Sequence, residues 1–234
     1  LAKEPFILTL PERRGRFFLM PMLDGWTNVI AAPGTRTIGT NAQRYAIVGP
    51  GWKGRLPQGL TGAYASPTSL VWIVGRTYSA GTPADNAAVH VIQERSSLVP
   101  LSAYGKRYTP PPGAVDPKID MKTPVREQVE RMDVVTYFKL LAELMTQSPP
   151  AAADAPMVAR MATLGIVPGK DFTLDKFTPG VAWALRGVPR AGLAKIRAHE
   201  KSARTTVNGW SYSMRTGVYG ADYLQRAFIA SQGL

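Results

Sequence analysis

Residues 47–54 read IVGPGWKG, and residues 69–77 read SLVWIVGRT. Each stretch is an apolar run that ends in glycine and a basic residue, which is typical of a short strand that ends at a turn. Because residues 44–48 and 70–74 are largely apolar at consecutive positions, we expect both faces of these strands to be covered, as in a sandwich or a closed barrel. The two stretches therefore predict a β-rich, antiparallel, sandwich- or barrel-like domain.

The composition agrees with a folded chain of many short strands. The protein has 234 residues, of which 45% are hydrophobic and 19% charged, with 22 glycines and 20 prolines that favour frequent turns. Two further apolar runs, residues 5–10 and 16–23, flank the sequence ERRG, whose glycine suits a tight turn. We predict that these two runs form a hairpin, and that residues 1–112 form the β-rich domain.

Helical signals interrupt and then follow the strands. Thr82 is a good N-cap, Pro83 suits the first helical position and Asp85 suits the first turn, so one helix is expected within the first domain. From Thr123 onward the apolar spacing is helical. We therefore predict a linker and helical segment over residues 113–205, and an α+β chain as a whole.

The net charge of +12 favours anionic partners, which include polyanions, anionic membranes and acidic substrates. No dense basic block, recognition-helix pattern or zinc-finger spacing is present, so nucleic-acid binding is not expected. With no cysteine, two histidines and no HxH or HExxH spacing, neither a metal nor another cofactor is expected. No apolar run approaches the ~18 residues of a membrane span, so no transmembrane segment is predicted.

Enzyme motifs are also missing from the sequence. There is no nucleophile elbow, Ser-His-Asp order or dinucleotide fingerprint, and GPGWKG lacks the spacing of a phosphate-binding P-loop. The motifs therefore leave open whether the protein is an enzyme.

The first candidate site lies at the predicted strand ends. Trp52 could offer an aromatic platform, and Lys53 and Arg76 could hold an anion beside glycines that let a ligand approach the backbone. The alternative is that the glycines serve turns and bulges, the tryptophan packs, and the cations are solvated or pair with Asp24.

The second candidate site lies near the C-terminus, where polar and aromatic residues gather. Asp222 and Arg226 have the spacing of a helical ion pair, and Tyr223 could donate a proton or a hydrogen bond. The alternative is that these residues only pin the last helix to its neighbours. The expected members are Asn208, Trp210, Tyr219, Asp222, Tyr223 and Arg226.

The two histidines offer weaker candidates. His90 follows Asp85 and Asn86 by about one helical turn, which could make a small polar cluster or the edge of a metal site, although the metal reading is the weaker one. His199 is expected to be exposed to solvent.

Several motifs together resemble a known family. They are FLMPMLDGWTNV (18–29), AIVGPGWKG (46–54), SPTSLVWIVGRT (66–77), PLSAYGKRYTPP (100–111), ADAPMVARMATLGIVPGKDF (153–172), and NGWSY with TGVYGADYLQRAFIA (208–230). As a set, the chain resembles bacterial proteins that pair domain of unknown function 1254 with domain of unknown function 1214.

The resemblance implies an exported protein, periplasmic or secreted, with cytoplasmic location as the alternative. It implies that residues 206–234 begin a second, jelly-roll-like β domain that is truncated here, completed by the remaining C-terminal part of the polypeptide as a separate chain, in a homo-oligomer. The expected function is binding of an anionic or carbohydrate-like ligand within this assembly. The alternative is a hydrolase or phosphate-handling enzyme whose site lies between the two β domains.

Overall fold

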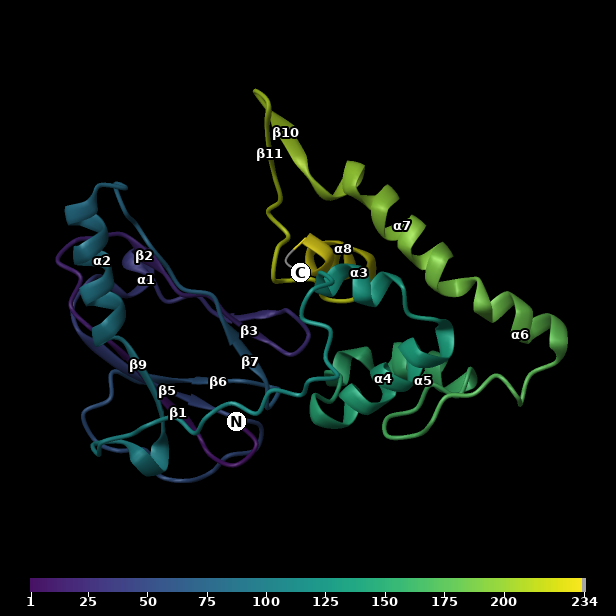
Figure 1. Cartoon of the computed structure of the whole chain (residues 1–234), viewed down its shortest axis with the longest axis horizontal. Helices are drawn as coiled ribbons and strands as arrows, with labels where there is room; N and C mark the ends of the chain where they lie inside the picture. Colours follow the sequence, from purple (N-terminus) through teal and green to yellow (C-terminus); the bar gives the residue numbers. More distant parts are fainter. Residues whose placement is uncertain (233–234) are drawn as a thin grey trace. The chain divides into compact units, whose positions relative to one another are not determined.

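The computed structural model describes residues 1–232 and divides the chain into two compact units, residues 1–112 and residues 113–234 (Figure 1). The chain has the mixed α+β content predicted from the sequence, with several small sheets. The last two residues of the predicted segment 206–234 lie outside the described residues.

The first unit is built on a four-stranded sheet with the strand order β6-β5-β1-β9. Strand β1 lies in its centre and pairs antiparallel with β5 and β9, whereas β6 pairs parallel with β5. The unit contains β1 (Phe6–Leu10), β2 (Phe18–Leu19), β3 (Met22–Asp24), β4 (Val29–Ala31), α1 (Thr35–Ile38), β5 (Gln43–Val48), β6 (Gly62–Ala65), β7 (Val71–Ile73), β8 (Arg76–Thr77), α2 (Pro83–Arg95) and β9 (Ser97–Pro100).

Three features of this sheet differ from the sequence-based predictions. The predicted hairpin between residues 5–10 and 16–23 is wrong, because both edges of β1 are occupied by β5 and β9, and β2 pairs with β8 instead. The β5–β6 pair is parallel, so the domain is not wholly antiparallel. The four-stranded sheet is open at β6 and β9, so it does not form the predicted closed barrel.

The core of the first unit joins the sheet to the short strands that follow β1. Its buried side chains are Leu8, Leu10, Phe18, Met22, Tyr45 and Ile47. Strand β5 is buried over Tyr45–Ile47, as its apolar run predicted. Residues 70–74 are less covered than predicted, since the side chains of Leu70 and Trp72 are 63% and 51% exposed. Strand β7 therefore has an open face.

The second unit is mainly helical. The break between α6 and α7 falls at Gly187, and α5 is followed by Gly165 in the left-handed region at φ 74°. Helix α7 packs against α3, α6 and α8. The elements are α3 (Val125–Glu130), α4 (Val134–Gln147), α5 (Ala155–Thr163), α6 (Pro179–Arg186), α7 (Val188–Ala203), β10 (Thr205–Val207), β11 (Trp210–Tyr212) and α8 (Tyr223–Gln232).

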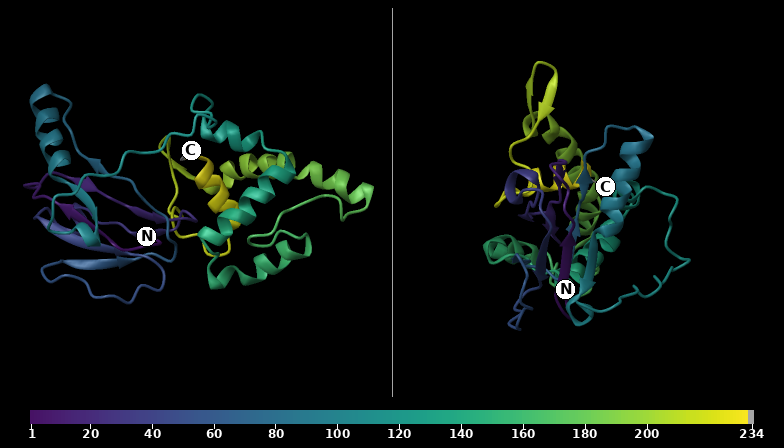
Figure 2. Two further views of the ribbon diagram at one scale, coloured as in Figure 1. Left: turned by 60° about the horizontal axis from the view of Figure 1, so that its bottom comes forward. Right: turned by 90° about the vertical axis from the view of Figure 1, so that its left-hand side faces the viewer.

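Strands β10 and β11 form a hairpin that extends beyond the helices of the second unit (Figure 1; Figure 2, right). Its turn is formed by Asn208 and Gly209, both with positive φ (51° and 80°), which is the pattern of a two-residue hairpin turn. All six strand residues are exposed. The hairpin has no strand neighbour among the described residues.

No helix among residues 1–232 is long and apolar enough to cross a membrane.

Candidate functional site

The segment that follows β1 makes the tight turn predicted from ERRG. Arg14 and Gly15 have positive φ (49° and 80°), and the amide of Arg16 donates to the carbonyl of Arg13 (2.9 Å). Thr40 holds the turn from the side, because its carbonyl accepts from the amide of Arg13 (2.8 Å) and its hydroxyl accepts from the amide of Gly15 (3.1 Å). The turn thus places three arginines, Arg13, Arg14 and Arg16, on one short segment.

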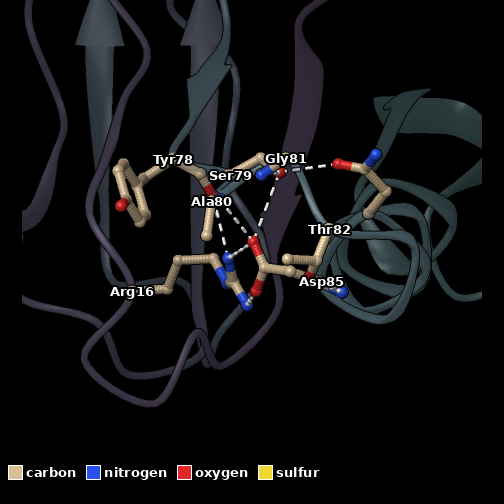
Figure 3. A network of polar contacts seen from close by, with 8 residues as sticks. Arg16, Tyr78, Ser79, Ala80, Gly81, Thr82 and Asp85 are labelled. Atoms are coloured by element: carbon tan, nitrogen blue, oxygen red, sulfur yellow. Dashed lines mark hydrogen bonds and ion pairs between the residues drawn. The ribbon is translucent and has the colours of Figure 1, made fainter.

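Arg16 connects this turn to helix α2 (Figure 3). Its Nη2 lies 2.6 Å from Oδ1 of Asp85, and its Nη1 donates to Oδ2 of Asp85 (3.0 Å) and to the carbonyl of Tyr78 (2.9 Å). Such a two-bonded arginine–carboxylate pair fixes geometry as well as charge. Arg16 therefore holds the start of α2 against the turn.

Asp85 collects further donors at the N-terminus of α2. The amide of Ala80 donates to its Oδ2 (2.7 Å), and the hydroxyl of Ser79 lies 3.2 Å from the same oxygen. The hydrogen bond from Arg16, followed by that from Ala80, holds the pKa of the Asp85 carboxyl well below its usual range. The amide of Asp85 in turn donates to the Thr82 hydroxyl (3.2 Å), so the predicted cap is present.

The turn and α2 enclose a cleft of about 1050 Å³. More positive than negative side chains line this cleft, since it contains four arginines and two carboxylates. The lining residues are Pro11, Glu12, Arg13, Arg14, Gly15, Arg16, Phe17, Tyr78, Asp85, Ala88, Val91, Ile92 and Arg95. Only Arg16 of the four arginines forms an ion pair among the described residues. Among the described residues, Arg13, Arg14 and Arg95 of the cleft thus form no ion pair.

Arg13 is the least expected member of this lining. It is 3% exposed, and its guanidinium lies 3.9 Å from the centre of the Phe18 ring. Its Nη1 donates to the carbonyl of Pro11 (3.0 Å), but its Nε is buried without a hydrogen-bond partner. Burial lowers its pKa. Buried charges in proteins are normally paired, so an unpaired buried guanidinium beside a cleft is a candidate site for an anion.

The strand-end residues predicted from the sequence lie on different sheets. Trp52 and Lys53 follow β5 of the four-stranded sheet, whereas Arg76 lies in β8, which pairs with β2. The ring of Trp52 lies against Gly54, where an added Cβ would come within 2.5 Å of the ring. Lys53 and Arg76 are exposed, and no described hydrogen bond or ion pair joins them. The structure thus does not bring the three together through direct contacts.

The alternative partner for these cations, Asp24, is used elsewhere. It is 6% exposed, and its carboxylate accepts from the amides of Trp26 (2.8 Å) and Asn28 (2.9 Å) and from the Asn28 side chain (2.9 Å). Asp24 therefore fixes the turn after β3. This turn holds Thr27 in the left-handed region, at φ 64°.

The predicted C-terminal cluster is only partly assembled. Asn208 and Trp210 lie in the β10–β11 hairpin and are exposed. The expected ion pair between Asp222 and Arg226 is absent from the described contacts, because Asp222 pairs with Arg215. Asp222 precedes α8 and accepts from the amide of Gln225 (2.9 Å), so its carboxylate turns toward the start of the helix.

Arg226 and Tyr223 share a partner that the sequence did not suggest, Asp154. The phenol of Tyr223 donates to Asp154 Oδ1 (2.8 Å), and Nη1 of Arg226 lies 4.0 Å from Asp154 Oδ2. Asp154 is 8% exposed. The hydrogen bond to Asp154, and then burial, raise the pKa of Tyr223. Tyr219 is buried below the guanidinium of Arg226, at 5.8 Å from its ring centre, and its hydroxyl has no partner.

The histidines take different places. His90 is exposed, while Asp85 and Asn86 are linked through Ser79, whose hydroxyl lies 2.6 Å from the Asn86 side-chain oxygen. The expected exposure of His199 is wrong, because its Nε2 lies 2.8 Å from Oε1 of the fully buried Gln225. Among residues 1–232, no group of three or more His, Cys, Asp and Glu side chains could hold a metal ion.

The arginine cleft was missed by sequence reasoning, which read ERRG only as a turn. The nearest signal was the position of Asp85 in the first turn of a helix, since such a carboxylate often has a cationic neighbour. Nothing local, however, pairs Arg16 with a residue 69 positions away.

Known proteins match this chain in two ways. Residues 1–100, which contain all of β1–β9, match the family model described as "Protein of unknown function (DUF1254)". The crystal structure of the VPA0106 protein from Vibrio parahaemolyticus is similar to 98% of this chain, with a TM-score of 0.68 and 20% sequence identity. No curated protein matches the chain.

The match to VPA0106 covers 53% of that protein, so this chain spans about half of its length. At 20% identity the likeness concerns the fold. The second half of the predicted family pairing, domain of unknown function 1214, stays a prediction. Residues 1–100, which include the arginine cleft, are thus similar to the DUF1254 family, and the fold of the chain is similar to that of VPA0106.

Proposed function

We propose that the first unit is a binding module for an anionic ligand, and that the ligand occupies the cleft between the Arg13–Arg16 turn and helix α2. The observation that carries this proposal is the buried guanidinium of Arg13, which forms no ion pair among the described residues and whose Nε has no hydrogen-bond partner there. Removing a charge from water without a partner is costly. A carboxylate, phosphate or sulfate in the cleft would supply the missing acceptor.

The other free cations of the cleft support the same ligand class. Arg14 and Arg95 are exposed and form no ion pair among the described residues, so both are free to bind an oxyanion. Guanidinium groups recognise carboxylate and phosphate through paired, parallel hydrogen bonds. Arg16 has a different role, because its guanidinium is already bound to the carboxylate of Asp85. Arg16 therefore positions the turn.

The test is calorimetric titration of the chain with inorganic phosphate and with acetate at low salt, where electrostatic binding is not screened. Arg13→Met keeps the buried stem and removes the charge, and Arg95→Gln removes an exposed charge of the cleft. We expect each variant to weaken phosphate binding about tenfold. Lys53→Gln is the matched control, because it removes an exposed positive charge outside the cleft. Equal losses in all three variants would mean that only net charge matters, and would overturn the proposal.

A hydrolase or phosphate-handling enzyme is the second candidate function. Its support is the buried Asp154 with Tyr223 and Arg226, beside the unpartnered hydroxyl of Tyr219. In such an enzyme Tyr223 would donate a proton and Arg226 would hold an anion. Hydrolysis of p-nitrophenyl phosphate or acetate that is lost in Tyr223→Phe would favour this candidate over the binding module.

We also propose a second domain and an assembly for this protein. We propose that residues 206–234 begin a second, jelly-roll-like β domain, completed by the remaining C-terminal part of the polypeptide within an exported, homo-oligomeric assembly. The exposed β10–β11 hairpin supports this, since a lone two-stranded hairpin is marginally stable in water. Intact mass under native and then denaturing conditions tests it. A lone species near 25.4 kDa in both would contradict the assembly.

A further inference from the structure

The same cleft also has apolar residues in its lining. The α2 residues that line it, Ala88, Val91, Ile92 and Arg95, have the i, i+3, i+4 and i+7 spacing of one helical face. This face starts at Asp85, which is bound to Arg16, and ends at the free cation of Arg95. One helix thus contributes both an apolar stripe and a positive charge to the cleft.

Two aromatic residues add to this apolar lining. Phe17 follows the arginine turn, and Tyr78 follows β8, where its amide donates to the carbonyl of Phe17 (2.9 Å). The side chains of Phe17, Tyr78 and Val91 are 45%, 59% and 43% exposed. Single exposed apolar residues are common on protein surfaces, but these three line one cleft together with four arginines.

We propose that the ligand of this cleft is an amphipathic anion, in which a carboxylate, phosphate or sulfate group is joined to an aliphatic or aromatic part. This inference rests on the proposed anion-binding function and adds the apolar part of the ligand to it. The charged group contacts Arg13, Arg14 and Arg95. The apolar part lies along Phe17 and Val91 and removes their exposed surface from water.

The apolar contact has a measurable effect on affinity. Burial of a methylene group contributes about fourfold in a binding constant. Burial of only two methylenes against Phe17 and Val91 therefore gives about a fifteenfold gain over the bare anion. A neutral ligand with the same alkyl group makes no charged contacts with the arginines, so its affinity lacks their contribution.

The experiment compares three probes by calorimetric titration of the whole protein. The two octyl probes are used below their critical micelle concentrations. Octyl phosphate carries both parts, inorganic phosphate carries only the charge, and octyl glucoside carries only the chain. We expect octyl phosphate to bind at least about tenfold more tightly than inorganic phosphate, and octyl glucoside to show no binding in the same range.

Variants of the apolar lining separate this inference from the proposed function. Phe17→Ser and Val91→Ser should each lower octyl phosphate affinity several-fold and leave phosphate affinity unchanged. Leu70→Ser is the matched control, because Leu70 is exposed in the same unit but lies outside the cleft. If both phosphates bind equally, and Arg13→Met weakens both, the ligand is a simple anion and the inference is overturned while the proposed function stands. If neither phosphate binds, the proposed function fails as well.

The same chemistry could come from a free amphiphile or from a lipid headgroup. Sedimentation with vesicles of phosphatidylcholine, with and without phosphatidylglycerol, distinguishes the two. Binding to anionic vesicles that Val91→Ser weakens assigns the cleft to a lipid, whereas octyl phosphate binding without such vesicle binding assigns it to a free amphiphile. Vesicle binding that Val91→Ser leaves unchanged, together with equal binding of the two phosphates, overturns the inference.

Discussion

Arg16 and Asp85 form a two-bonded ion pair, with Nη2–Oδ1 and Nη1–Oδ2 separations of 2.6 Å and 3.0 Å, that joins the turn after β1 to the first turn of α2 (Figure 3). The pair brings together two segments 69 residues apart. It fixes one edge of the cleft and occupies one of the four arginines in its lining. The other arginines therefore stay available to a ligand while α2 is held in place.

This pair should make the first unit sensitive to acid in a particular window. The folded protein holds the pKa of Asp85 well below the ordinary aspartate value. A lowered pKa in the folded state contributes stability that is complete above the unfolded pKa, about 4, and is lost as the pH falls through the folded pKa. We expect Asp85→Asn to lower the melting temperature by a few degrees at every pH from 7 to about 4, and the difference from the natural protein to shrink at lower pH.

Thermal unfolding at pH 7, 5, 3 and 2, followed by circular dichroism, measures this effect. Asp116→Asn is the control, because Asp116 is exposed and forms no ion pair among the described residues. A difference between Asp85→Asn and the natural protein that stays constant down to pH 2 would contradict the assigned role of the carboxylate.

The turn after β3 should become more stable when Thr27 is replaced by glycine. Thr27 has φ 64°, and its hydroxyl is buried without a partner. A β-branched side chain in the left-handed region costs about 1–2 kcal/mol, and glycine avoids this at the cost of greater freedom in the unfolded chain. We expect Thr27→Gly to raise the free energy of unfolding by about 1 kcal/mol in urea titrations. Thr9→Gly, within β1, should lower it, and a loss in both variants would contradict the strain at Thr27.

Local signals predicted the parts of the fold that depend on neighbouring residues. The cap formed by Thr82 and Asp85 is set within one turn of helix, so the sequence indicates it directly. The Asn208–Gly209 hairpin turn is a local signal of the same kind. Such features could be read from the sequence.

Pairings across the chain could not be read in the same way. Strand β1 was expected to pair with the next strand, yet β5 and β9 take both of its edges. The Asp222–Arg226 pair follows helical spacing, but Asp222 lies just before α8 and caps it, which frees Arg226 to approach Asp154. The arginine cleft likewise depends on tertiary structure, because Arg13 and Arg95 line one cleft only after α2 folds back onto the turn. Sites of this kind depend on tertiary contacts that no local pattern contains.

The second unit should depend strongly on Phe228. This side chain is 1% exposed on α8, and its ring meets the His199 ring edge-on at 6.1 Å and the Arg204 guanidinium at 5.5 Å. Truncation of a buried phenylalanine to alanine typically costs 3–5 kcal/mol. We expect Phe228→Ala to lower the stability of residues 113–232 by about this amount and to leave the first unit unchanged.

Hydrogen exchange resolved by peptide separates the two units in this experiment. Leu224→Ala is the control on the same helix, since Leu224 is 38% exposed, and it should cost less than about 1 kcal/mol. Equal loss of protection in both units after Phe228→Ala would mean that the two units do not unfold separately.

Tyr223 gives the second unit a pH dependence of the opposite sign. Its phenol donates to the buried carboxylate of Asp154, and this bond, with burial, raises the pKa of Tyr223. A raised pKa in the folded state contributes stability that is complete below the unfolded value, about 10, and is lost as the pH rises through the folded pKa. Tyr223→Phe removes the donor and should cost about 1–2 kcal/mol at neutral pH.

The stability difference between Tyr223→Phe and the natural protein is therefore expected to stay constant with pH and then to fall. Its difference in unfolding free energy from the natural protein should be constant from pH 6 to 9 and should shrink above about pH 10, because ionised Tyr223 can no longer donate to Asp154. Urea titrations at pH 7, 9 and 11 measure this difference. Tyr212→Phe, in the exposed hairpin, should show no effect at any of the three values. A Tyr223→Phe difference that is as large at pH 11 as at pH 7 would contradict the assignment of that difference to the hydrogen bond with Asp154.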